Sequence, residues 1–163
     1  MIALIGVGNI LLRDEGAGVH VINAIKKRYT FSPEVEIVDG GTMGLDLLPI
    51  IEGKDKVLII DAVDFGKEPG YIGIIENDAI PFVLNTKLSV HHINLSDVLF
   101  ALKLIGRFPS EICLIGIQPQ SIDVGLNMTD GINDKIDKLI EEALIRLKRW
   151  GVLCYKHQEP VKA

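Results

Sequence analysis

The sequence is poor in several features, and each shortage argues against a class of protein. Only two cysteines occur among 163 residues, Cys113 and Cys154, and they form no CxxC pair. A disulfide framework is therefore not expected, and both thiols are predicted to stay reduced in the cytoplasm. No apolar run approaches the roughly 18 residues that span a bilayer, and no basic leader with a cleavage site opens the chain. The net charge of −5 argues against a nucleic-acid surface.

Common catalytic and cofactor motifs are missing as well. The chain has no G-x-S-x-G elbow and no H-E-x-x-H pair, and no local signature marks either cysteine as a nucleophile. Gly6-x-Gly8 resembles half of a dinucleotide fingerprint, but Leu11 stands where the third glycine is required. We therefore expect no permanently bound cofactor. The two glycines are interpreted as a tight turn with positive φ.

Hydrophobic residues are abundant, at 48% of the chain, and they alternate between strand and helix patterns. The expected strands are 2–6, 35–38, 56–61, 71–75 and 111–117, and the expected helices are 15–29, about 44–52, about 95–105 and a last helix from an N-cap at Thr129 to Gly151. The connection before 71–75 is too short for a crossover helix, so this strand is predicted to be antiparallel. The pattern predicts an α/β fold, a three-layer α/β/α sandwich on a mostly parallel five-stranded sheet. Residues 1–151 are expected to form one domain, and 152–163 a polar, loosely held tail.

The order of the first three strands indicates where a site should lie. Right-handed crossovers place the second and third strands on opposite sides of the first, which gives the order 2-1-3. Open α/β sheets bind ligands beyond the carboxyl ends of the strands at such a reversal. Glu15 in the first connection and Asp61 at the end of the third strand both open into this crevice.

Three polar residues are candidates for one metal site, namely Glu15, Asp61 and His91. Asp14 and Glu15 both stand at a helix start, where one carboxylate suffices for capping; we assign that role to Asp14. Asp61 ends an apolar strand, where a buried carboxylate needs a partner or a shifted pKa. A Glu, an Asp and an imidazole form a mixed oxygen and nitrogen ligand set that suits nickel or zinc.

Several segments together resemble the nickel-iron hydrogenase maturation endopeptidases. The matching segments, in chain order, are Gly6–Gly18 with its G-x-G-N and D-E-G-x-G blocks, Asp39–Gly44, Asp61–Gly66, Ser89–His91 and Gly116–Pro119. They span the chain from residue 2 to about 149, and the opening block is specific to the family. Leu126–Thr129 is a variant of the family's helix-entry motif, and His92 stands where the family often has glutamine.

The resemblance implies an aspartyl-type endopeptidase that removes the C-terminal extension of the hydrogenase large-subunit precursor after nickel insertion. The family's metal-contacting residues carry over to Glu15, Asp61 and His91. The nickel is expected to come from the substrate, the protein to be a cytoplasmic monomer, and its partner to be the precursor.

Two aspects of function stay open at the sequence level. The metal either polarises the scissile carbonyl or activates water, or it only docks the substrate while a carboxylate such as Asp39 or Asp64 acts as general base. The alternative function is a non-catalytic metal- or nucleotide-binding maturation chaperone.

Overall fold

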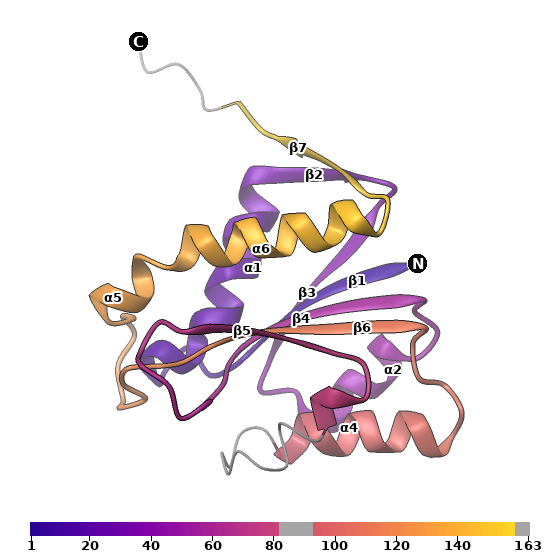
Figure 1. The fold of residues 1–163 in the computed structure, drawn as a ribbon, viewed down its shortest axis with the longest axis horizontal. Helices are drawn as coiled ribbons and strands as arrows, with labels where there is room; N and C mark the ends of the chain where they lie inside the picture. Colours follow the sequence, from indigo (N-terminus) through magenta and orange to yellow (C-terminus); the bar gives the residue numbers. More distant parts are fainter. Residues whose placement is uncertain (82–92, 159–163) are drawn as a thin grey trace.

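The computed structural model describes residues 1–81 and 93–158, and its centre is a five-stranded sheet in the order β3-β1-β4-β6-β5 (Figure 1). The strands are β1 (Ile2–Val7), β3 (Val35–Gly41), β4 (Lys56–Ala62), β5 (Ile72–Glu76) and β6 (Glu111–Ile117). All neighbours pair in parallel except β5, which runs antiparallel to β6. The predicted sheet, its antiparallel strand and the 2-1-3 beginning are confirmed.

Helices cover both faces of this sheet, as the continuous apolar strands require. Alternation along β4 sends Leu58 and Ile60 into one apolar cluster and Val57 and Ile59 into the other. Figure 1 shows α1 and α6 on the first face and α2 and α4 on the second. The 3-10 helix η2 also covers the second face, where its Leu47 belongs to the apolar cluster. Their bounds are α1 (Ala17–Arg28), η2 (Gly44–Leu47), α2 (Leu48–Ile51), α4 (Ile93–Leu104) and α6 (Ile136–Arg149). The three-layer prediction is confirmed.

The last helix is split, in contrast to the single helix expected from Thr129. A four-residue helix, α5 (Asp130–Asn133), precedes α6 (Ile136–Arg149). Leu139, Ala143 and Leu147 recur every four residues and are fully buried against the sheet. Gly151 follows the helix with φ of 86°, the left-handed conformation that commonly ends helices.

A second, two-stranded sheet lies beside the main one, and the sequence analysis missed it. The first helix ends at Arg28, and β2 (Tyr29–Ser32) pairs antiparallel with β7 (Leu153–Lys156). The prediction of a loose tail from residue 152 is therefore wrong for β7. Val152 and Phe31 are buried at this sheet and anchor both strands. Four-residue strands show too few alternating positions for sequence periodicity to detect them.

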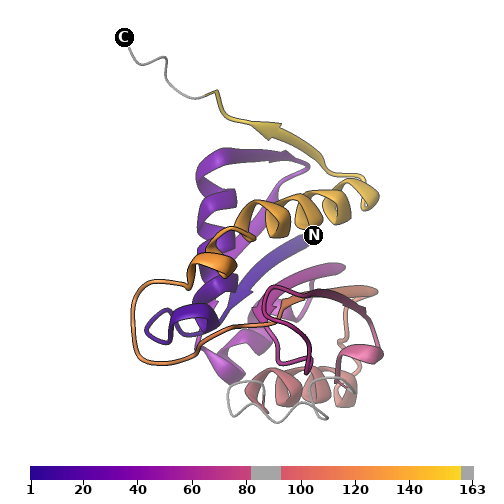
Figure 2. The same ribbon diagram turned by 60° about the vertical axis from the view of Figure 1, so that its left-hand side comes forward.

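The β1–α1, β4–β5 and β6–α5 connections leave the sheet at its carboxyl edge, where β1, β4 and β6 end. This edge lies at the left of Figure 1, and the turned view of Figure 2 shows the connection between β6 and α5 looping beside η1 (Arg13–Gly16). Within the described residues no helix has the length and apolar character needed to cross a membrane.

Candidate functional site

Glycines allow the first connection to lie directly on the ends of the strands. Gly8 has φ of 134°, and a Cβ there would stand 1.9 Å from the Glu15 carbonyl oxygen. A Cβ on Gly18 would stand 2.2 Å from the carbonyl oxygen of Ile60 in β4. Larger side chains at these positions would push η1 and α1 away from the sheet. The glycine-rich opening block therefore places Glu15 against the carboxyl ends of β1 and β4. The positive φ expected at both glycines is confirmed at Gly8 and is wrong for Gly6, which continues β1.

Two of the predicted metal ligands come to this edge as buried carboxylates. Glu15 in η1 is 4% exposed, and Asp61 near the end of β4 is 3% exposed. η1 contacts β4, so both carboxylates belong to adjoining elements at the reversal of strand order. A buried carboxylate requires hydrogen bonds, an ion pair or a metal. Two such groups from distant segments are typical of a site that binds a cation.

The third predicted ligand, His91, lies outside the described residues. Within 1–81 and 93–158, no three His, Cys, Asp or Glu residues form a group that could hold a metal ion. The structure describes Glu15 and Asp61 at the carboxyl edge. The metal site of Glu15, Asp61 and His91 stays a prediction.

Asp14 does not cap the helix as predicted, although it is fully buried. Its carboxylate accepts hydrogen bonds from the backbone amides of Gln120, Ser121 and Thr129, at 3.0, 3.0 and 2.7 Å. The Thr129 hydroxyl also donates to it, at 2.8 Å from Oδ2. Thr129 is the N-cap residue of α5 as predicted, but its hydroxyl binds Asp14 and not a helix amide. Asp14 thus fixes the connection from β6 to α5 beside Glu15.

Arg13 provides a second attachment for the same connection. Its φ of 49° is rare for a residue with a side chain and turns its backbone toward the connection. The Arg13 amide donates to the Gly125 carbonyl at 3.0 Å, and the Gly125 amide donates to the Leu11 carbonyl at 2.8 Å. The Arg13 Nε donates to the Asn127 carbonyl at 3.0 Å. These hydrogen bonds join the connection after β1 to the connection after β6.

Gln118 organises the connection that follows Asp61. Its Oε1 accepts a hydrogen bond from the Phe65 amide at 2.6 Å, and its Nε2 donates to Asp64 Oδ1 at 3.2 Å. The Gly66 amide donates to the same oxygen at 2.9 Å, so the exposed carboxylate of Asp64 has a defined orientation. The motif Gly116–Pro119 contained Gln118, but the sequence could not show which loop its amide would reach.

The Phe65 ring covers the strand next to Asp61. A Cβ on Gly116 or on Gly73 would stand 2.7 Å from this ring, so both positions need glycine. Gly116 on β6 is the register partner of Asp61. Directly paired residues lie on the same face of a sheet, so the Phe65 ring over Gly116 covers the face to which Asp61 points. An apolar ring at this place lowers the dielectric around the Asp61 carboxylate and strengthens its interaction with a cation.

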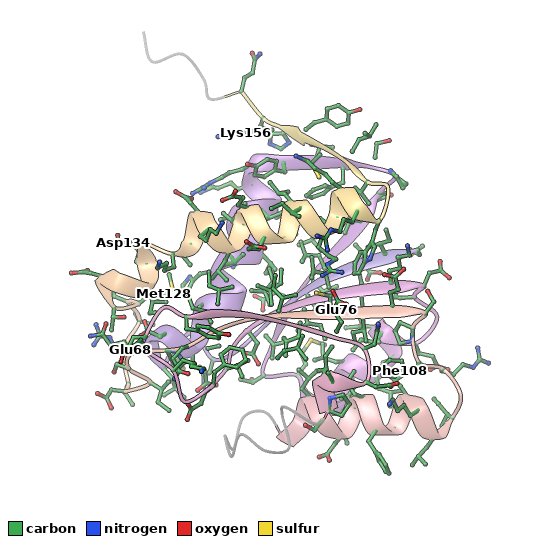
Figure 3. The ribbon with its side chains drawn as sticks, in the orientation of Figure 1. Glu68, Glu76, Phe108, Met128, Asp134 and Lys156 are labelled. Atoms are coloured by element: carbon green, nitrogen blue, oxygen red, sulfur yellow. The ribbon has the colours of Figure 1, made fainter. Side chains whose placement is uncertain are left out.

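Asp39, a predicted general-base candidate, lies apart from Asp61. It is exposed near the end of β3 and is level with Gly6 of β1 and Ile60 of β4. Strand alternation therefore points Asp39 toward the face covered by α1 and Asp61 toward the other face. Figure 3 shows Glu68 and Met128, from the connections after β4 and β6, at the carboxyl edge that carries Asp61.

The cysteines take no part in this edge. Cys113 is packed in the apolar cluster between the sheet, α1 and α6, and burial raises the pKa of its thiol to about 11. A thiol nucleophile requires a lowered pKa, so the geometry agrees with the absence of a cysteine-protease signature.

Comparisons with known proteins agree with one another. Residues 19–146 match the family model described as hydrogenase maturation protease. The chain is 38% identical to the hydrogenase 2 maturation protease of Escherichia coli over 152 residues, which cover 93% of each protein. It is also 38% identical to the hydrogenase expression/formation protein HoxM of Cupriavidus necator, over 93% of this chain and 76% of that protein.

Solved structures show the same relationship. The fold superimposes on the hydrogenase maturating endopeptidase HybD of E. coli with a TM-score of 0.92 and 36% identity, over 96% of this chain and 97% of that one. The HybD protease of Thermococcus kodakarensis gives a TM-score of 0.74 at 25% identity, over 89% and 97%. This chain, with its buried Glu15 and Asp61 at the carboxyl edge, belongs to the hydrogenase maturation protease family and is a hydrolase of the endopeptidase type.

Proposed function

We propose that this endopeptidase removes the C-terminal extension of a nickel-iron hydrogenase large-subunit precursor after nickel insertion. The observation that carries the proposal is the pair of buried carboxylates, Glu15 and Asp61, at the strand-order reversal of a family member. The matched E. coli protein is named as a hydrogenase 2 maturation protease, which supports a hydrogenase precursor as substrate. No observation favours the non-catalytic chaperone alternative.

The nickel belongs to the substrate in this proposal and is recognised through Glu15, Asp61 and His91. Two carboxylate oxygens and an imidazole nitrogen suit a borderline divalent metal. Glu15 and Asp61 are buried, so water screens their attraction to a cation only weakly, and a nickel-free precursor lacks this attraction. Nickel loading would thereby control docking of the precursor.

We propose Asp64 as the general base in preference to Asp39. Asp64 follows Asp61 by three residues, and Gln118 and the Gly66 amide orient its carboxylate. Asp39 points to the opposite face, beyond β1. In the proposed step Asp64 accepts a proton from the attacking water and returns it to the leaving amine as the peptide bond breaks. A metal that polarises the scissile carbonyl is compatible with this step.

The test incubates the purified protein with nickel-loaded and nickel-free precursor and follows the loss of mass of the extension. Cleavage of the loaded form alone is expected. Equal cleavage of both forms would reject recognition of nickel, and cleavage of neither competent precursor would favour the chaperone function.

A pair of histidine variants tests the third ligand. His91→Ala should abolish processing with an unchanged thermal melting temperature, and His92→Ala should have a mild effect. The reverse result would move the ligand to position 92.

We further propose that the protein works as a monomer in the cytoplasm. Light scattering of the purified protein measures its mass and tests whether it is a monomer.

A further inference from the structure

Exposed aliphatic side chains gather on the connection from β6 to α5, residues 118–129. Ile122, Val124 and Leu126 are 50%, 87% and 66% exposed, and Val124 is the most exposed large apolar side chain among the described residues. The connection after β1 adds Leu11, which is 54% exposed. These four side chains are called the apolar surface. Single exposed apolar residues are ordinary, whereas a group of them marks an interaction site.

Backbone hydrogen bonds bring the two parts of the apolar surface together. Leu12 and Gly125 form a parallel bridge, and the Gly125 amide donates to the Leu11 carbonyl at 2.8 Å. Two chain segments joined in this way run side by side in the same direction. Leu11 and Val124, which precede the bridged residues, are therefore neighbours, and Leu126 follows directly after Gly125.

The protein holds this connection in a fixed conformation with its apolar side chains outside. The Asp14 carboxylate accepts hydrogen bonds from the amides of Gln120, Ser121 and Thr129, on both sides of the exposed residues. The Asp123 amide donates to the Ser121 hydroxyl oxygen at 3.3 Å. A partner that covers the apolar surface removes it from water, which is favourable. Because the backbone is already ordered, little conformational entropy is lost on binding.

The apolar surface borders the proposed nickel site. Asp14, which holds the connection, directly precedes Glu15 in η1. Figure 2 shows the connection looping beside η1, and Figure 3 shows Met128, two residues after Leu126, at the carboxyl edge. A protein whose nickel is bound at Glu15 therefore has its neighbouring surface against these side chains.

The charge and the size of the apolar surface argue against two other partners. The charged residue among residues 122–126 is Asp123, so the surface lacks the lysine and arginine residues that an anionic membrane attracts. The four side chains expose roughly 400 Å², so two copies of the chain joined here would bury about 800 Å² in total, less than a stable dimer needs. A substrate needs only a transient contact, because it must leave after cleavage, and it adds contacts at the nickel site.

We propose that the apolar surface docks an apolar patch on the folded body of the hydrogenase large-subunit precursor, close to its nickel. The inference rests on the proposed function, because it requires that precursor as the substrate. The apolar surface aligns the precursor while Glu15 and Asp61 bind its nickel. Two contacts from separate connections hold the precursor in one orientation, so that the extension reaches the cleavage site in a defined position.

The first experiment compares matched leucine variants in precursor cleavage. Leu126→Ser and Leu104→Ser make the same change at side chains of similar exposure, 66% and 71%, but Leu104 ends α4 at the opposite, amino edge. The double variant Val124→Ser, Leu126→Ser should raise the KM for nickel-loaded precursor about tenfold and leave kcat and the melting temperature unchanged. Leu11→Ser, on the other connection, should also raise KM, and Leu104→Ser should change neither constant. An unchanged KM in the double variant, a fall in kcat alone, or an equal rise in KM for Leu104→Ser overturns the proposal.

The second experiment measures binding of the nickel-free precursor by titration calorimetry. The apolar surface contains no proposed metal ligand, so it should bind this form, and the double variant should weaken the affinity about tenfold. Sodium chloride at about 0.5 M should not weaken binding by the wild type, because salt screens charges and not apolar contacts. Failure of the wild type to bind, equal affinities of the wild type and the double variant, or a loss of affinity in salt overturns the proposal. Light scattering that shows a wild-type dimer and a monomeric double variant would assign the surface to a second copy instead.

Failure of the docking surface and failure of the proposed function give different results. Normal cleavage with an unchanged KM in the double variant rejects the docking surface alone. A wild type that binds the precursor about tenfold more tightly than the double variant, but cleaves neither form of it, rejects the proposed cleavage alone.

Discussion

The carboxylates at the two edges of the central sheet differ in burial. At the carboxyl edge Asp14, Glu15 and Asp61 are 0%, 4% and 3% exposed. At the amino edge the carboxylates of Asp55, Glu36 and Glu111 have side-chain exposures between 44% and 73%. Each of the latter pairs with a nearby ammonium group, Asp55 with the N-terminus, Glu36 with Lys54 and Glu111 with Lys56.

The difference in burial predicts how strongly each group of carboxylates affects the protein. Exposed ion pairs contribute little to stability because water and salt screen both partners. Buried carboxylates lose hydration, so they persist only where hydrogen bonds or a cation compensate. Asp14 receives hydrogen bonds from the connection between β6 and α5. Glu15 and Asp61 are proposed to bind the nickel of the substrate. Substitutions at the carboxyl edge should therefore have large effects, and substitutions at the amino edge small ones.

The largest effect is expected for Glu15→Gln. The change keeps the size of the side chain and removes the charge that binds nickel, so precursor cleavage should fall at least about a thousandfold, or about 4 kcal/mol in the activation barrier. The thermal melting temperature should stay near that of the wild type. Glu36→Gln, the same change at the amino edge, is the control and should cleave normally. Normal cleavage by Glu15→Gln would contradict the metal-docking account.

A large effect on stability is expected for Asp14→Ala. The variant leaves the amides of Gln120, Ser121 and Thr129 without their acceptor, so the free energy of unfolding should fall by about 3 kcal/mol. Urea denaturation at neutral pH measures this difference. The free energy of unfolding of Asp14→Asn should lie between those of the wild type and Asp14→Ala, because the asparagine NH₂ group would face backbone donors. A loss below about 1 kcal/mol would mean that other contacts hold the connection.

Cys113 lies between the two edges and should be chemically inert. With its pKa raised to about 11 by burial, only about one thiol in a thousand is ionised at pH 8. Iodoacetamide should leave Cys113 unmodified in the folded protein, label it after denaturation, and leave precursor cleavage unchanged. Peptide mass mapping gives the site of labelling. Inactivation that parallels Cys113 modification would indicate a thiol mechanism.

The smallest effect is expected for Glu111→Gln at the amino edge. A hydrogen bond from Trp150 Nε1 lowers the pKa of Glu111 against the opposing effect of burial, and Lys56 lowers it further. The carboxylate therefore stabilises the fold above its ordinary pKa of 4.5, and this contribution is lost as the pH falls through the lowered value. At pH 7 the variant should melt at a slightly lower temperature than the wild type. This difference in melting temperature should disappear as the pH is lowered to 3. A difference in melting temperature that grows as the pH falls would contradict a lowered pKa of Glu111 in the folded protein.

Local patterns in the sequence were sufficient for the main architecture. Continuous apolar strands require cover on both faces, and a connection too short for a helix forces β5 to be antiparallel. Crossover handedness then brought Glu15 and Asp61 to one edge. The sequence alone named Asp39 as a general-base candidate, but it could not say toward which face of the sheet Asp39 points. Register and alternation decide that, since Asp39 and Asp61 differ by one position across the sheet.

Only the tertiary structure decided the contacts between segments distant in sequence. Asp14 looked like a helix cap because a capping carboxylate and a loop-binding carboxylate have the same local sequence. Its partners, more than 100 residues away, become neighbours only when β1 and β6 lie in one sheet. The same holds for Gln118 with Asp64 and for the pairing of β2 with β7. Sequence periodicity reports which side of an element is apolar, whereas long-range hydrogen bonds depend on where folding places the other partner.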